Sequence, residues 1–154
     1  MEHIAFMQKS WGLTEKIATG QKTIESRWYN VKYAPWGKIA PGDIIYFKDS
    51  GEPITLQAEV EKILTFTHLM PQQVQALLEE YGNDCGIEPD QIPVYYERFQ
   101  HKRYAMFLFL KNVQRIPPFE INKAGFGKKA SWIYIDSVER LRSRTSSHSS
   151  SSTC

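Results

Sequence analysis

The chain has 154 residues, of which 42% are hydrophobic and 13% aromatic, and these proportions predict one folded globular domain with a substantial core. The formal net charge of +2 is too small to indicate a nucleic-acid-binding protein by itself, although basic residues can still gather locally. No stretch approaches the ~20 apolar residues of a membrane span, and Met1 begins no signal-peptide pattern, so we expect a cytoplasmic protein without a membrane partner.

The first third of the chain predicts a strand, a helix and a second strand. The strand covers Ile4–Met7 and the helix Trp11–Thr19, with Ser10 as its N-cap and Gly20 in the left-handed position after its end. The second strand covers Thr23–Trp28. Because side chains alternate along a strand, one face is expected to carry Ile24, Ser26 and Trp28, and the other Thr23, Glu25 and Arg27.

The middle of the chain predicts two further strands after a loop over residues 30–42, which is rich in aromatic residues. Asp43–Lys48 has a buried character, and Ile54–Phe66 alternates until a change of phase near Ile63, where we expect a bulge. A helix then runs from Pro71 to Gly82.

The remaining elements are a helix over Val94–Lys102, a strand over Tyr104–Val113 that Pro117-Pro118 ends, a strand over Trp132–Ile135 and a final helix from Asp136. Long alternating strands with helices between them indicate an α+β fold with a closed or nearly closed β-barrel. We expect a single domain over residues 1–142 and a disordered Ser-rich tail over residues 143–154.

The segment from Gly20 to Trp28 carries the strongest functional signal, because it places charges of both signs on one strand face. Lys22 and Glu25 have two interpretations. They are either catalytic, as an acid–base pair or with Lys22 as an activated amine, or they form a structural ion pair. Arg27 offers a planar fork for a phosphate or a carbonyl, or is simply held by Glu25.

Further candidates for ligand contact lie on both sides of this segment. Lys9, Ser10 and Trp11 precede the helix and form either an anion site or a capped and packed helix start. Trp28 either stacks on a base or packs in the core. The remaining candidates are Lys48 and Ser50 at a strand end, and Lys128 in a Gly/Lys loop that otherwise serves as solvated surface.

Cofactor and metal chemistry find no support in the sequence. The four histidines are scattered without metal-ligand spacing, so no metal site and no cofactor are expected. Cys85 and Cys154 make neither a disulfide framework nor a zinc site, which favours a reducing compartment.

The residues Gly20, Lys22, Thr23, Glu25 and Arg27 match the pattern G-x-K-T-x-E-x-R, and with it the chain resembles the ASCH domain family, a relative of the PUA-like barrels. The resemblance implies a barrel of five to six strands and a role related to RNA or nucleotides. One branch of the family deacetylates acetylcytidine with a lysine, a threonine and a downstream glutamate. Lys22 matches that lysine, Glu25 stands at the threonine position, and the glutamate would fall near Glu79 and Glu80.

Three functions remain open on this basis. The first is a module that binds RNA or a modified nucleotide in a cationic cleft beside the motif strand. The second is a small amidohydrolase that acts on an acylated nucleoside such as acetylcytidine. The third is a protein-interaction domain that uses the aromatic loop from Tyr29 to Trp36.

Overall fold

The computed structural model describes residues 1–123, 126 and 130–143. The strands are β1 (Glu2–Met7), β2 (Ile24–Tyr29), β3 (Ile44–Asp49), β4 (Ile54–Phe66), β5 (Tyr104–Phe119) and β6 (Trp132–Ile135). The helices are α1 (Leu13–Thr19), α2 (Pro71–Tyr81) and α3 (Ile92–Phe99), together with the short 3-10 turns η1 (Lys9–Trp11), η2 (Pro89–Gln91) and η3 (Val138–Leu141). Lys128 and residues 144–154 of the expected tail lie outside the described residues.

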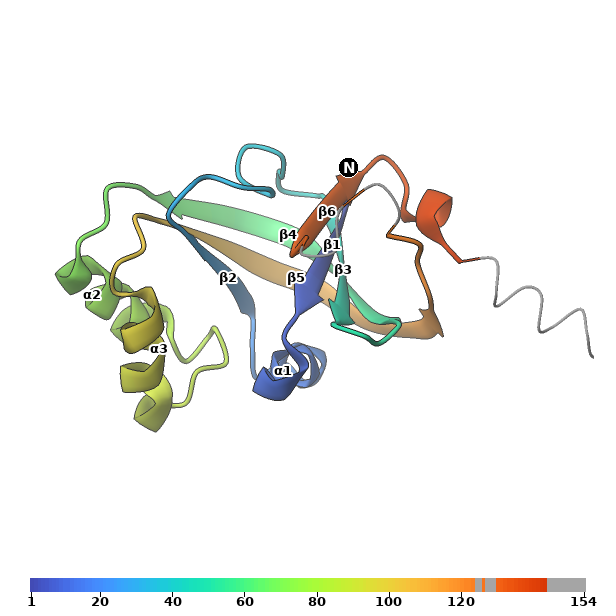
Figure 1. Ribbon diagram of the computed structural model, residues 1–154. Helices are drawn as coiled ribbons and strands as arrows, with labels where there is room; N and C mark the ends of the chain where they lie inside the picture. Colours follow the sequence, from blue (N-terminus) through green and yellow to red (C-terminus); the bar gives the residue numbers. More distant parts are fainter. Residues whose placement is uncertain (124–125, 127–129, 144–154) are drawn as a thin grey trace, which may run out of the picture.

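The strands form one curled sheet in the order β2-β5-β4-β3-β1-β6 (Figure 1). β1 pairs with β3 in parallel, and the other neighbouring pairs are antiparallel. The expected α+β fold with five to six strands is therefore confirmed, in the form of a half-barrel with β2 and β6 at the two ends of the strand order. The expected bulge of β4 is also present, between Val60 and Lys62.

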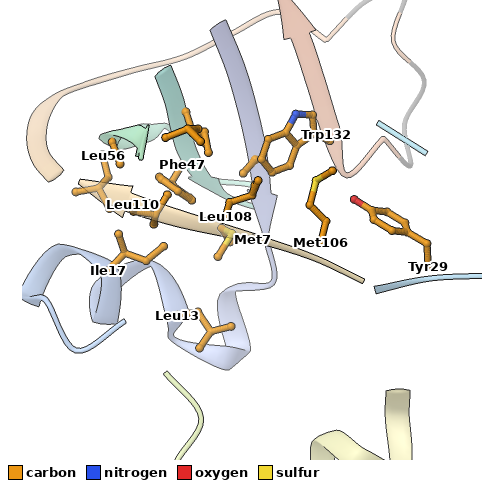
Figure 2. Packing of buried hydrophobic residues seen from close by; sticks show 14 residues of the cluster. Met7, Leu13, Ile17, Tyr29, Phe47, Leu56, Met106, Leu108, Leu110 and Trp132 are labelled. Carbon is orange, nitrogen blue, oxygen red and sulfur yellow. The ribbon is translucent and has the colours of Figure 1, made fainter. Parts of the chain in front are cut away.

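The main hydrophobic core lies between the concave face of the sheet and α1 (Figure 2). Leu13 and Ile17 lie one helical turn apart on α1 and belong to the same buried cluster as Phe47 and Leu108 of the sheet. Ile17 is completely buried, which contributes about 1.5–3 kcal/mol to stability. This packing fixes α1, and with it the junction between α1 and β2 that carries the sequence motif.

A second hydrophobic cluster attaches α2 and α3 to one end of the sheet. Figure 1 shows the two helices side by side there. Val74, Leu77 and Leu78 of α2 are buried against Phe107 of β5, whereas α3 buries none of its residues completely. Among the described residues, no helix is long and apolar enough to cross a membrane.

Three local expectations are wrong, each for a physical reason. Ser10 is not a helix cap, because it lies inside the 3-10 turn η1 and Gly12, with φ +67°, precedes α1 instead. β5 continues through Pro117-Pro118 to Phe119. β2 pairs only with the first part of β5, so the later part of β5 has an edge without a β2 partner, where a proline that lacks an N–H is tolerated. The final helix from Asp136 is only the single turn η3.

Candidate functional site

A cleft of about 260 Å³ opens beside the motif strand β2, between the end of β1, the start of α1 and helix α3. Four aromatic rings follow one another along its wall. Trp11 meets Tyr95 edge-on with ring centroids 5.8 Å apart, and Tyr95 lies 5.9 Å from Phe99. Phe99 in turn stacks on Trp28 at 4.9 Å with nearly parallel planes. The cleft therefore has an aromatic lining that suits a flat, apolar-faced ligand.

Three charged side chains from the motif line the cleft together. Lys22 Nζ lies 3.1 Å from Glu25 Oε1, and Arg27 approaches Glu25 Oε2 at 2.8 Å through both Nε and a terminal nitrogen. Lys22 and Glu25 are almost completely buried. We call these three residues the charge triad. It has a net charge of +1, so it favours a ligand that carries electron-rich or anionic groups.

The ammonium group of Lys22 has every hydrogen engaged. It donates to the carbonyl of Ile24 at 2.6 Å and of Cys85 at 3.0 Å, in addition to its ion pair with Glu25. An ammonium group has three N–H donors, so these acceptors saturate it. Lys22 thereby ties the start of β2 to the loop after α2, which is the role of a positioning residue.

Glu25 is held ionised in spite of its burial. Burial raises the pKa of Glu25, but the charges of Lys22 and Arg27 and their hydrogen bonds outweigh this effect and hold its pKa below the ordinary value. Glu25 therefore presents a carboxylate to the cleft across the neutral pH range. It is a hydrogen-bond acceptor there, suited to an amino group of a ligand or to a water molecule.

Arg27 spans the opening between the two ends of the sheet. Its terminal nitrogens lie 3.4 Å from the carbonyl oxygen of Ser131 and 3.5 Å from that of Phe6, and its guanidinium carbon lies 5.1 Å from the ring centre of Trp132. Both carbonyl distances exceed those of good hydrogen bonds, so these donors can turn to a ligand at little loss. Arg27 is the motif residue best placed to contact a ligand.

The opposite face of β2 also contributes to the cleft, through Ser26 and Trp28. The indole nitrogen of Trp28 donates to Ser26 Oγ at 3.1 Å, which fixes the ring against Phe99. The thiol of Cys85 also lines the cleft, and burial raises its pKa to about 11. A thiol with this pKa is protonated at neutral pH and is a poor nucleophile.

The other predicted site residues lie outside the cleft. Lys9 is exposed and paired with Glu52, and Ser10 lines a surface depression next to the cleft rather than the cleft itself. The amide of Trp11 already donates to Gln8, so no free amide of Trp11 supports the anion site expected there. Lys48 and Ser50 line a second pocket next to the cleft.

Two further expectations are resolved by the positions of the side chains. Glu79 and Glu80 are exposed on α2, and Glu25 is the only carboxylate among the described residues that line the cleft. In the aromatic loop, Tyr29 is buried and Trp36 packs against it edge-on, with ring centres 6.4 Å apart. Tyr33 is the one aromatic ring of this loop that is largely exposed, so little of the loop's aromatic surface remains for a protein partner.

Several residues of the cleft are not among the predicted site residues. Tyr95 and Phe99 are four positions apart in α3, and this spacing, which places two side chains on one helix face, was the available signal. Phe6, Gln8 and Ser131 also line the cleft. No local pattern marks these three, because the pairing of β1 with β6 brings them together.

Comparison with known proteins supports the fold. No protein-family model and no curated protein matches the sequence. Among solved structures, ASCH from Zymomonas mobilis superimposes with a TM-score of 0.65 at 19% identity, covering 92% of this chain and 96% of that one. A serine-to-alanine variant of that protein gives a TM-score of 0.64 at 18% identity, over 90% of this chain and 91% of the other. The chain therefore has an ASCH-like fold.

Proposed function

We propose that the protein binds RNA or a modified nucleotide, with a base held in the cleft beside β2. The observation that carries this proposal is the combination of an aromatic wall with a buried, net-positive charge triad at one site. A nucleobase offers flat faces for the wall and hydrogen-bonding edges for polar groups. A cleft of about 260 Å³ suits one base rather than a stacked pair.

Different residues meet different parts of the base in this proposal. Arg27 donates to ring nitrogens or carbonyl oxygens, and Glu25 accepts from an exocyclic amino group. Trp11 and Trp28 supply the apolar surface. Lys22 does not touch the base, because its three donors are occupied within the protein.

Calorimetric titration with the four ribonucleosides and with short single-stranded RNA tests the proposal. We expect Arg27→Ala to weaken binding by about tenfold or more, since a charged hydrogen bond contributes about 1.5–3 kcal/mol. Arg115→Ala is the matched control, because Arg115 is an exposed arginine paired with Glu15 and lies outside the cleft. Absence of binding to every nucleoside and RNA, or equal binding by the two variants, would refute the proposal.

One observation favours a second candidate function, the hydrolysis of an acylated nucleoside. Glu25 is an ionised carboxylate in the cleft, and a water molecule bound to it would attack the acyl carbon. Glu25 would take the proton of that water and pass it to the amine nitrogen as the C–N bond breaks. Lys22 would keep Glu25 ionised and in position rather than act as the base.

Chromatographic detection of cytidine released from acetylcytidine tests this second candidate. We expect turnover by the wild-type protein, and its loss in Glu25→Gln with the fold intact by circular dichroism. Gln75→Ala, on the exposed side of α2, is the control. A protein that binds cytidine but releases none from acetylcytidine would be a binding module without this activity.

A further inference from the structure

The second pocket contains a lysine without an ionic partner. Lys48 lies near the end of β3, is only 8% exposed and lines this pocket of about 580 Å³. Among the described residues, no carboxylate lies within ion-pair distance of its ammonium group, and the ring centre of Phe6 lies 5.7 Å from it. Because no buried side-chain nitrogen of the described residues lacks a hydrogen-bond partner, the ammonium group of Lys48 reaches the solvent of this pocket, where an anion can pair with it.

The acidic residues close to Lys48 in the sequence are engaged elsewhere. Asp49 accepts a hydrogen bond from Thr14 Oγ1 at 2.6 Å, and Glu52 is paired with Lys9. Neither carboxylate forms an ion pair with Lys48. The charge of Lys48 remains available to an anion from outside.

The other residues of the second pocket strengthen its positive character. Lys123 lines it as well, with its ammonium 4.3 Å from the ring centre of Phe6. Ser50 contributes a hydroxyl at the turn after β3. Burial, together with the nearby charge of Lys123, lowers the pKa of Lys48 even though the charges of Glu120, Glu52 and Asp49 oppose this. A bound anion would offset the repulsion between the charges of Lys48 and Lys123.

The second pocket adjoins the cleft. Phe6, Gln8 and Ser131 line both, so the two pockets lie side by side around the end of β1. A ligand seated with its base against Trp28 can therefore extend past these three residues towards Lys48. The sugar and the phosphate of a nucleotide lie in this order from the base.

We propose that the second pocket is a phosphate subsite, in which Lys48, Ser50 and Lys123 bind the phosphate of a nucleotide whose base occupies the cleft. This inference rests on the proposed base-binding function and makes it more specific. The preferred ligand is a phosphorylated nucleotide or an RNA phosphodiester rather than a free nucleoside. Lysine binds phosphate as a point charge, and a serine hydroxyl adds a directional donor.

Titration with matched ligands tests the subsite. We would compare each ribonucleoside with its 5′-monophosphate, its 3′-monophosphate and a dinucleotide, using wild type, Lys48→Met and Lys62→Met. Lys62 is an exposed lysine of β4 outside both pockets, so Lys62→Met removes the same charge elsewhere. We expect a phosphorylated ligand to bind about tenfold or more tightly than its nucleoside. Lys48→Met should abolish this gain and Lys62→Met should retain it.

Inorganic phosphate separates failure of the subsite from failure of base binding. We expect phosphate to shift the amide NMR signals of Lys48, Ser50 and Gly51 in wild type and in Lys62→Met, but not in Lys48→Met. Phosphate binding without nucleoside binding would support the subsite and refute the base-binding function. Equal affinity for nucleosides and nucleotides, or a phosphate gain that survives in Lys48→Met, would overturn the subsite. Lys48→Arg keeps the positive charge, so it should still bind the phosphorylated ligand more tightly than the nucleoside. This result would show that Lys48→Met acts through the loss of charge and not through unfolding.

Discussion

At the scale of single residues, Lys22 shows how a buried charge contributes to the architecture of the cleft. Replacing it by methionine in Lys22→Met removes one of the two cationic partners of Glu25 and the donor to the carbonyl groups of Ile24 and Cys85. Removing one partner of a buried ion pair costs about 3–5 kcal/mol. We therefore expect a loss of this size in the free energy of unfolding, measured by urea denaturation.

The matched control for Lys22 is Lys9→Met. Lys9 also has a carboxylate partner, Glu52, but both side chains are exposed to water, where an ion pair contributes little. We expect a small change in this variant. Similar losses in the two variants would mean that burial of Lys22 has no energetic consequence.

His3 is a buried residue whose protonation couples stability to pH. Its Nε2 donates to Asp43 at 2.9 Å, and its Nδ1 accepts from the indole of Trp132 at 3.0 Å. Burial lowers the pKa of His3 from 6.5, and Asp43 offsets this only in part. Protonation of Nδ1 would also break the hydrogen bond from Trp132, whose ring lies against Arg27.

The sign of the pH effect follows from this lowered pKa. The unfolded chain binds a proton at His3 more readily than the folded protein does. Neutral His3 therefore contributes its full share to the stability of the fold above pH 6.5, and this share is lost as the pH falls below 6.5 towards the pKa of His3 in the folded protein. Melting temperatures between about pH 7.5 and about pH 5.5 should fall for wild type and for His68→Gln, an exposed control, and fall less for His3→Gln. An equal decline in all three proteins would remove His3 as the cause.

At the scale of elements, the loop after α2 holds the motif in place. The amides of Thr23 and Ile24 both donate to the carbonyl of Asp84, and Lys22 donates to that of Cys85. Gly86 completes the junction with a φ of +82°, and a Cβ there would lie 3.1 Å from Cβ of Lys22. Only glycine meets both demands at this position, a left-handed backbone and close approach to the lysine stem.

Gly86→Ala is therefore expected to weaken both stability and the cleft. Gly37→Ala is the matched control, because Gly37 has a φ of +73° with no atom within 4 Å of the added Cβ. In both variants an alanine must adopt a left-handed backbone conformation, which costs about 1–2 kcal/mol. Gly86→Ala also displaces Lys22. We expect a larger fall in melting temperature and in nucleoside affinity for Gly86→Ala. Equal effects would show that backbone strain accounts for the whole change.

The same elements show how far the sequence predicts this structure. Hydrophobic alternation locates the strands, and the motif residues Lys22, Glu25 and Arg27 meet as their spacing suggests. The sequence does not reveal that Lys22 is saturated, because one of its acceptors, Cys85, is 63 positions away. It also misses Ser131, which reaches the cleft through the pairing of β6 with β1. Local propensity carries no information on such distant contacts.

At the scale of the whole molecule, the distribution of charge matters more than its total of +2. Several surface arginines are neutralised by ion pairs, as in Arg115 with Glu15, Arg140 with Asp136 and Arg142 with Glu139. These pairs leave a weak long-range field. Any salt dependence of RNA binding should therefore come from the few cations that contact phosphate directly, above all those of the second pocket.

This distribution predicts a shallow salt dependence of binding to single-stranded RNA. Each neutralised phosphate contributes about −0.7 to the slope of the logarithm of the association constant against the logarithm of salt concentration, so the one phosphate bound by Lys48 and Lys123 gives a slope of about −0.7. Lys48→Met should lower its magnitude by about 0.7, and nucleosides should show almost no slope. Fluorescence titrations of a trinucleotide at several salt concentrations measure this slope. A much steeper slope, unchanged in Lys48→Met, would place the RNA on the outer surface, because the two pockets together hold too few cations to produce it.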